Sequence, residues 1–201
     1  MLRRQLVVFW LVLSAPPLLG ATPLSTIESM LLKPTVLCGR FEQKKQLVGF
    51  KNAVNSSGRF CVVAGKGVLW RTLKPFPTAL RLNRDEIVQL HGDRVTLRLE
   101  AKKEPTVRMI NTVLFALLAV DIGQLEKHFE IDGSVQNNVW SIRLKALEPA
   151  LAKAIGSIAF EGGVYVRSIR IDEASGDRTS IDLMAIETGE SAMDADEAKL
   201  F

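Results

Sequence analysis

The chain has 201 residues, of which 47% are hydrophobic and 24% are charged, and its formal net charge is +4. This length is enough for one domain with a hydrophobic core, and the sequence contains no internal repeat and no low-complexity linker. The excess of basic residues suits an anionic membrane surface or an acidic partner, or is ordinary solvated charge. Nucleic acid is excluded as a partner, because the basic residues are not interleaved with aromatic ones.

The first residues have the pattern of an export signal. Arg3 and Arg4 form a positive segment, an apolar run covers residues 6–13, and prolines and small residues follow up to Ala21. The apolar run is shorter than the roughly 20 residues of a spanning helix. We therefore expect residues 1–21 to be a cleaved signal peptide and the mature protein to be periplasmic. An uncleaved anchor is the alternative.

Apolar alternation predicts a series of antiparallel strands in the first half of the chain. Before them, residues 25–28 have the capping-box pattern that opens a short helix, and Pro34 ends it. Polar residues and glycines between the apolar runs indicate turns. The predicted strands cover residues 36–48, 58–63, 66–71, 78–82, 86–90 and 94–100, and the last two form a hairpin.

The apolar period becomes helical in the middle of the chain. Residues 105–120 are predicted to form a helix that starts at Pro105, and a second helical segment covers residues 122–128. Further strands are predicted at residues 129–131, 140–144, 157–161, 165–171 and 179–185, with a short helix at 146–154. The predicted fold class is therefore α+β, with many short antiparallel strands and few helices packed on one side.

The last residues of the chain are acidic. Five carboxylates (Glu187, Glu190, Asp194, Asp196 and Glu197) stand there with a single lysine among small residues. Such a composition is typical of disorder. We expect a signal peptide at residues 1–21, a domain at 22–186 and a disordered acidic tail at 187–201.

The two cysteines, Cys38 and Cys61, are placed symmetrically about residue 49. A hairpin centred there puts them opposite each other on neighbouring strands, close enough for a disulfide. An oxidising compartment permits such a bond. Two alternatives stay open at this point, a disulfide or two buried thiols.

Signals for catalysis are absent from the sequence. It has no zinc-protease, CxxC, nucleophile-elbow or phosphate-loop motif, and too few suitable residues for a metal site. The two histidines, His91 and His128, fall in different predicted elements, and Cys61 stands among valines, which is typical of an inert thiol. We expect neither an enzyme nor a cofactor, and no catalytic or metal-binding residue.

One face of the predicted strands is strongly apolar. Alternation brings six side chains to this face from three strands: Leu37, Phe41, Phe60, Val62, Val68 and Trp70. The apolar helix around Phe115 is expected to cover something. The sequence leaves two arrangements open, a closed core or a cavity under a movable lid that takes up an acyl chain.

The chain resembles the outer-membrane lipoprotein carrier family (LolA-like) over nearly its full mature length. The resemblance is carried by Phe41-x-Gln43, by Ser57-Gly58-x-Phe60, and by Gly67-Val68-Leu69-Trp70 before Pro75. It implies an incomplete antiparallel β-barrel, or half-barrel, with a helical lid. It also implies that a ligand cavity is lined by Leu37, Phe41, Phe60, Val62, Val68 and Trp70, with Phe115 from the lid.

The same resemblance implies a function. Members of this family take acylated lipoproteins from an inner-membrane release complex and pass them to an outer-membrane receptor, without covalent chemistry. We therefore expect a monomeric periplasmic carrier that shields acyl chains. The alternatives are a carrier for a non-protein acyl or polyene lipid in envelope lipid export, and a non-enzymatic periplasmic interaction module with a filled core.

Two features depart from the family's pattern. Ala64 stands where studied members carry a basic residue that helps control the lid, and Lys66 follows two residues later. The middle of the chain has residues 91–93 and a charged strand in place of the family's aromatic-rich strand. These differences indicate a divergent branch.

Overall fold

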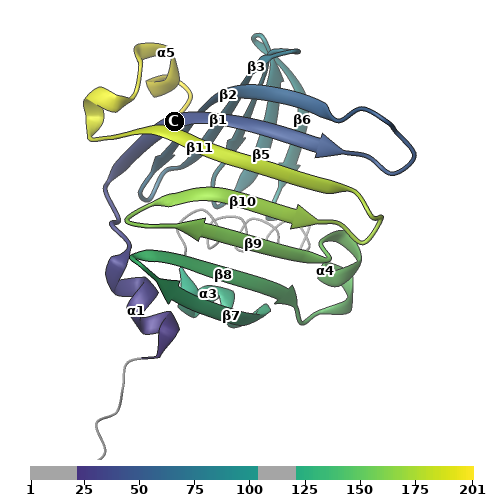
Figure 1. Cartoon of the computed structure of the whole chain (residues 1–201). Coiled ribbons are helices and arrows are strands. Elements are labelled where there is room, and N and C mark those ends of the chain that lie inside the picture. The colour runs from purple at the N-terminus through teal and green to yellow at the C-terminus, as the bar shows by residue number, and fades with distance from the viewer. Residues whose placement is uncertain (1–21, 104–120) are drawn as a thin grey trace, which may run out of the picture.

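A computed structural model describes residues 22–103 and 121–201. Its main feature is a single 11-stranded sheet in which every neighbouring pair of strands is antiparallel (Figure 1). The predicted signal peptide, the predicted helix at residues 105–120 and Phe115 lie outside the described residues.

The strands run through the sheet in the order β6-β5-β4-β3-β2-β1-β11-β10-β9-β8-β7. The chain therefore builds one half outward from the centre and the other half back toward it. Their bounds are β1 Val36–Gln46, β2 Val54–Val63, β3 Gly67–Lys74, β4 Thr78–Leu82, β5 Glu86–His91, β6 Arg94–Glu100, β7 Phe129–Gln136, β8 Val139–Ala146, β9 Ser157–Gly162, β10 Val166–Asp172 and β11 Arg178–Thr188.

The described helices are short. They are α1 Pro23–Met30, α3 Ile122–Leu125, α4 Pro149–Ala154, the 3₁₀ turn η1 Glu190–Ala192 and α5 Ala195–Ala198. The predicted strands are all present and differ from the observed ones mainly at their ends. The α+β prediction is confirmed.

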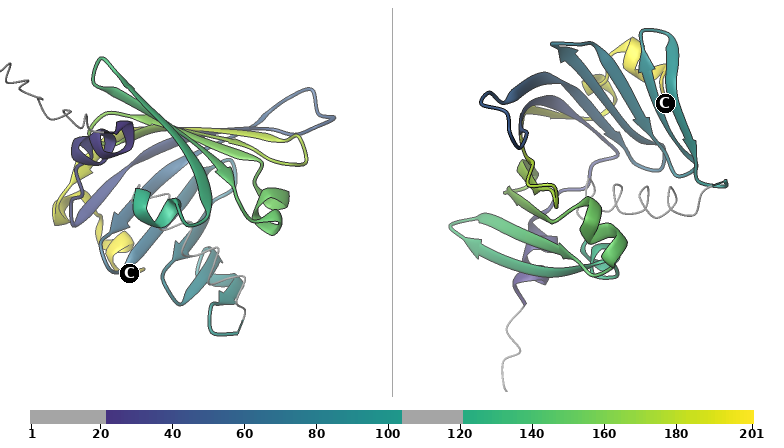
Figure 2. Two further views of the ribbon diagram at one scale, coloured as in Figure 1. Left: turned by 90° about the horizontal axis from the view of Figure 1, so that it is seen from below. Right: turned by 90° about the vertical axis from the view of Figure 1, so that its right-hand side faces the viewer.

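The sheet is curved and open. Among the described strands, β6 and β7 form its two ends, and neither pairs with the other. Figure 2 shows β3–β6 on one side of the molecule and β7–β9 on the other. The predicted incomplete antiparallel barrel is therefore confirmed.

Two phenylalanine–glycine pairs connect β1 and β2. Gly39 lies opposite Phe60, and Phe41 lies opposite Gly58. A side chain at Gly58 would collide with the Phe41 ring and with the carbonyl oxygen of Arg71 on β3. Because glycine leaves this space free, the Phe41 ring can stack on Trp70 of β3, with ring centroids 4.0 Å apart.

We call the face that bears Phe41, Phe60 and Trp70 the inner face of the sheet. Helices α1 and α3 help to cover it, and the main core lies beneath them. Ile27 of α1, Leu125 of α3 and Trp140 of β8 are fully buried in this core. The Trp140 indole nitrogen donates to the carbonyl oxygen of Gly163, so its polar group is also satisfied.

Helix α1 begins earlier than the sequence pattern indicates. The N-cap is Thr22, whose hydroxyl accepts a hydrogen bond from the Ser25 backbone nitrogen, and Pro23 occupies the first turn. The prediction that Ser25 opens the helix was therefore wrong. Proline is favoured in the first turn, where its missing N–H leaves no bond unmade, and this extends the helix back to Thr22.

The acidic C-terminal segment is folded. Instead of the predicted disordered tail, residues 187–201 contain the end of β11, η1 and α5, drawn in yellow in Figure 1. Ala192, Met193, Leu200 and Phe201 pack against a cluster on the opposite, outer face of the sheet, around Cys38, Cys61 and Leu69. Apolar residues spaced among the carboxylates thus anchor a segment whose composition suggests disorder.

Candidate functional site

The most distinctive hollow of the described chain is an apolar pocket of about 290 Å³ at the inner face. It lies where the linker between α1 and β1 meets strands β1, β2, β10 and β11. Its lining consists of Leu31, Leu32, Lys33, Pro34, Leu37, Phe60, Val62, Ala64, Tyr165, Val166, Ile169, Leu183 and Ile186.

The chemistry of the lining is almost uniform. Of these residues, Lys33 and Tyr165 have polar side-chain atoms, and the others are apolar. Leu32, Lys33 and Ala64 are exposed to solvent, which places the mouth of the pocket near the linker. The pocket can therefore accept an apolar chain from solvent but offers few groups for hydrogen bonding.

Two backbone hydrogen bonds hold the linker at this mouth. The Leu32 backbone nitrogen donates to the carbonyl oxygen of Val164 at 3.0 Å, and the Ala64 backbone nitrogen donates to that of Thr35 at 2.8 Å. The linker is thus fastened to the β9–β10 turn at one end and to the end of β2 at the other. Its side chains form one wall of the pocket.

The structure divides the predicted cavity residues into two groups. Leu37, Phe60 and Val62 line the pocket, but Phe41, Val68 and Trp70 do not. All six share one face as predicted, because Leu37 pairs with Val62, Val62 with Val68, and Phe60 with Trp70.

Packing explains why three of these side chains are not in the lining. Phe41 and Trp70 stack on each other, so each occupies the space next to the other. Val68 is buried in a neighbouring cluster with Leu82 and Ile87. The prediction that all three line a cavity does not match this pocket, and they support its wall from behind.

The other lining residues come from two sources that strand alternation does not reveal. Four belong to the linker, for which the sequence shows apolar Leu31 and Leu32 directly after a helix. The remaining ones belong to β10, β11 and the turn before β10. Bulges interrupt both strands there, so their apolar residues do not follow a simple period of two.

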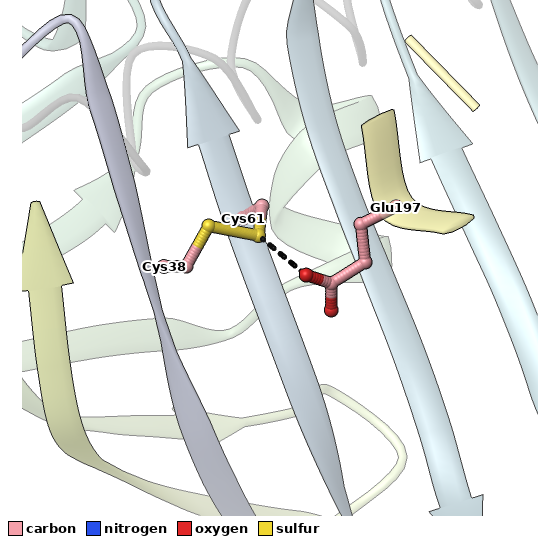
Figure 3. A group of neighbouring side chains, drawn as sticks. All are labelled: Cys38, Cys61 and Glu197. Carbon is pink, nitrogen blue, oxygen red and sulfur yellow. Dashed lines mark hydrogen bonds between the residues drawn. A yellow bond between two sulfur atoms is a disulfide. The ribbon is translucent and has the colours of Figure 1, made fainter. Parts of the chain in front are cut away.

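A second cluster lies on the outer face, around a disulfide between Cys38 and Cys61 (Figure 3). The two residues are directly opposite in the β1–β2 register, as the hairpin geometry predicts. A carboxylate oxygen of Glu197 lies 3.6 Å from the Cys61 sulfur. These three side chains have the spacing of metal ligands, but bonded sulfurs offer no thiolate, so the cluster does not form a metal site.

Glu197 also joins the C-terminal segment to the sheet. Its carboxylate accepts hydrogen bonds from Arg59 Nε at 2.8 Å and Nη2 at 3.2 Å. The hydrogen bond with Glu197 raises the pKa of the Arg59 guanidinium, against an opposing effect of burial. The cluster is a structural anchor, because its charged groups are paired with each other.

The histidines are not brought together. His91 is exposed at the end of β5, and His128 Nδ1 lies 2.9 Å from Glu148 Oε1. This hydrogen bond lowers the pKa of the Glu148 carboxyl. Within residues 22–103 and 121–201, no helix is both long and apolar enough to cross a membrane.

A comparison with protein families gives a match to the model of "outer membrane lipoprotein carrier protein LolA" over residues 33–197. The chain belongs to this family. The match contains β1 to β11 and most of the C-terminal segment. LolA-family proteins are carriers rather than enzymes, and membership together with the fold indicates a carrier-type function in lipoprotein sorting or lipid binding.

Solved structures support the same fold. A DUF1329 family protein from Desulfovibrio piger matches with a TM-score of 0.50 and 12% identity, over 89% of this chain and 96% of that one. A putative outer membrane lipoprotein-sorting protein domain from Vibrio parahaemolyticus matches with a TM-score of 0.44 and 7% identity, over 88% and 95%. A LolA superfamily protein from Nitrosomonas europaea matches with a TM-score of 0.43 and 5% identity, over 84% and 92%. Curated protein sequences give no match to this LolA-family chain.

Proposed function

We propose that this protein is a periplasmic carrier that shields the acyl chains of lipoproteins in the apolar pocket and moves them from the inner to the outer membrane. The pocket is the observation that carries the proposal. Burying an apolar chain is favourable by about 0.8 kcal/mol per CH₂, and the lining supplies apolar side chains from the linker and from four strands. No covalent chemistry is needed for such transfer.

Leu37, Phe60 and Val62 are proposed as contacts of the acyl chain. Phe41, Val68 and Trp70 are proposed to act indirectly, by fixing the position of that wall. Export by a signal peptide at residues 1–21 places the carrier in the periplasm, and an inner-membrane release complex and an outer-membrane receptor are its proposed partners.

Ala64 provides a direct test. Ala64 lines the pocket but is exposed, so Ala64→Trp adds a large side chain at the mouth without disturbing the core. We expect the unmodified protein to bind N-phenyl-1-naphthylamine, an apolar fluorescent probe, and Ala64→Trp to weaken binding by about tenfold or more, equivalent to about 1.4 kcal/mol.

The matched control is Ala174→Trp, at an exposed position in the turn between β10 and β11. It adds the same side chain away from the pocket and should bind the probe like the unmodified protein. Circular dichroism should show that both variants are folded. Absence of probe uptake by the unmodified protein, or equal binding by both variants, would favour the interaction-module alternative.

A further inference from the structure

We propose that the pocket takes a single acyl chain that ends in an anionic group, and that Lys33 binds this group at the mouth. The proposal rests on the proposed function, since it assumes that the pocket holds acyl chains. It adds the charge of the ligand's head group and the residue that recognises it.

The position of Lys33 is fixed by its neighbours in the linker. Leu32 is hydrogen-bonded to Val164, and Thr35 is hydrogen-bonded to Ala64. Lys33 stands between these two attachments and lines the pocket while its side chain is exposed. An ammonium group on a flexible stem at this place can reach the polar end of a molecule whose apolar end is inside.

The charge of Lys33 is not balanced by the pocket. Its lining contains no carboxylate, and Lys33 makes no ion pair with any side chain among the described residues. Other basic groups on the sheet are paired, as Arg59 is with Glu197 and Lys45 with Glu173. A positive group at the mouth of an apolar pocket favours an anion there, because the apolar wall screens the charge less than water does.

The apolar surroundings of the mouth agree with an amphiphilic ligand. Leu32 and Val164 are both exposed large apolar residues and are held together by the backbone hydrogen bond. They extend the apolar lining outward to the level of Lys33. A ligand that leaves the pocket at this point thus passes from an apolar to a positively charged surface.

The volume limits how many chains can bind. At about 290 Å³, the pocket is at the lower end of the range of about 300–1,000 Å³ for small-molecule sites. It suits one acyl chain of medium length. The anionic group can be the carboxylate of a free fatty acid or the phosphodiester of a single-chain phospholipid, and the shared chemistry is a negative charge at the end of one chain.

The experiment compares ligands with the same chain and different head groups. Dodecanoate and dodecanoyl lysophosphatidylglycerol are the anionic ligands, and dodecanol and the methyl ester of dodecanoic acid are the neutral ones. Each is titrated into the protein by displacement of N-phenyl-1-naphthylamine, at a pH above the pKa of the acid. We expect at least one anionic ligand to bind about fivefold more tightly than the neutral ones, as is typical of an exposed ion pair.

Variants of Lys33 identify the source of this preference. Lys33→Gln should remove it, Lys33→Glu should reverse it, and Lys33→Arg should retain it, while neutral ligands bind all three variants alike. Lys51→Gln, in the turn between β1 and β2, is the matched control and should change nothing. Added salt should reduce the preference in the unmodified protein.

The outcomes separate this inference from the proposed function. Dependence on Lys33 for dodecanoate or for the lysophospholipid supports the inference and identifies which source of charge is recognised. Equal binding of anionic and neutral ligands, or a preference that Lys33→Gln leaves intact, overturns the inference and leaves the carrier function standing. If no ligand binds the unmodified protein, both are overturned.

Discussion

Glu197 is a buried carboxylate, 1% exposed, that faces two arginines on the outer face of the sheet. Arg59 and Arg71 lie directly opposite each other on β2 and β3. Like charges in such positions destabilise a sheet, and Glu197 offsets this. It also accepts a hydrogen bond from the Asp194 backbone nitrogen, which completes the capping box of α5.

Replacement of Glu197 should therefore destabilise the fold. We expect Glu197→Ala to reduce the free energy of unfolding by about 2–4 kcal/mol, because it removes a buried ion pair and a helix cap together. Glu197→Gln should cost less, since glutamine can still serve in a capping box. Urea denaturation followed by circular dichroism measures both changes.

Asp196→Asn is the control within the same helix. Asp196 pairs with Lys199 at the surface, and such pairs contribute little, so its effect should be below about 0.5 kcal/mol. Equal effects of the substitutions at Asp196 and Glu197 would mean that the anchor does not stabilise the fold. The sequence already contained a sign of this anchor, because Asp194-x-x-Glu197 has the spacing of a capping box.

At the scale of elements, glycines determine how closely the central strands approach each other. A β-carbon at Gly58 would lie 1.9 Å from the carbonyl oxygen of Arg71 and 2.9 Å from the Phe41 ring. This position is next to an irregularity in the β2–β3 register. Gly58 therefore permits both the close approach of β3 and the stacking of Phe41 on Trp70.

A methyl group at Gly58 should disturb both contacts. We expect Gly58→Ala to lower stability by about 3 kcal/mol, at the upper end of typical overpacking costs, and to change the near-ultraviolet circular dichroism of the Phe41–Trp70 pair. Gly163→Ala is the matched control, because a β-carbon there has its nearest neighbour at 3.7 Å. A stable Gly58→Ala protein with an unchanged spectrum would contradict this account.

Bulges decide which apolar residues of β10 and β11 reach the pocket. Leu183 and Ile186 both line it although they are three residues apart, because an irregularity in the β1–β11 register and a positive φ at Ala185 lie between them. Val166 and Ile169 have the same spacing across an irregularity in β10. In a regular strand, residues three apart point to opposite faces. An alternation rule therefore cannot assign these four residues to one cavity.

The whole molecule contains one strongly apolar pocket among its described hollows. Two other hollows, around Ser57 and Ser141, are lined largely by polar side chains. We therefore expect native mass spectrometry of the protein purified from a bacterial periplasm to show one acylated ligand per chain, lost on denaturation. A mass of the unliganded chain, with no uptake of added lipopeptide or fatty acid, would indicate an interaction module instead.

The sequence by itself determined the order and faces of the strands, because alternation with a period of two follows directly from strand geometry. It also placed Cys38 opposite Cys61, because a hairpin pairs residues that are equally distant from its turn. It correctly placed Leu37, Phe60 and Val62 on one apolar face of the sheet.

Tertiary structure decided which of those apolar residues enclose space and which fill it. Trp70 and Phe41 are as apolar as the residues that line the pocket, but they stack on each other and do not reach it. Lys33 reaches the mouth because two long-range hydrogen bonds hold its linker there. Curvature, bulges and contacts between distant segments set the shape of the pocket, and these depend on interactions that no local sequence pattern contains.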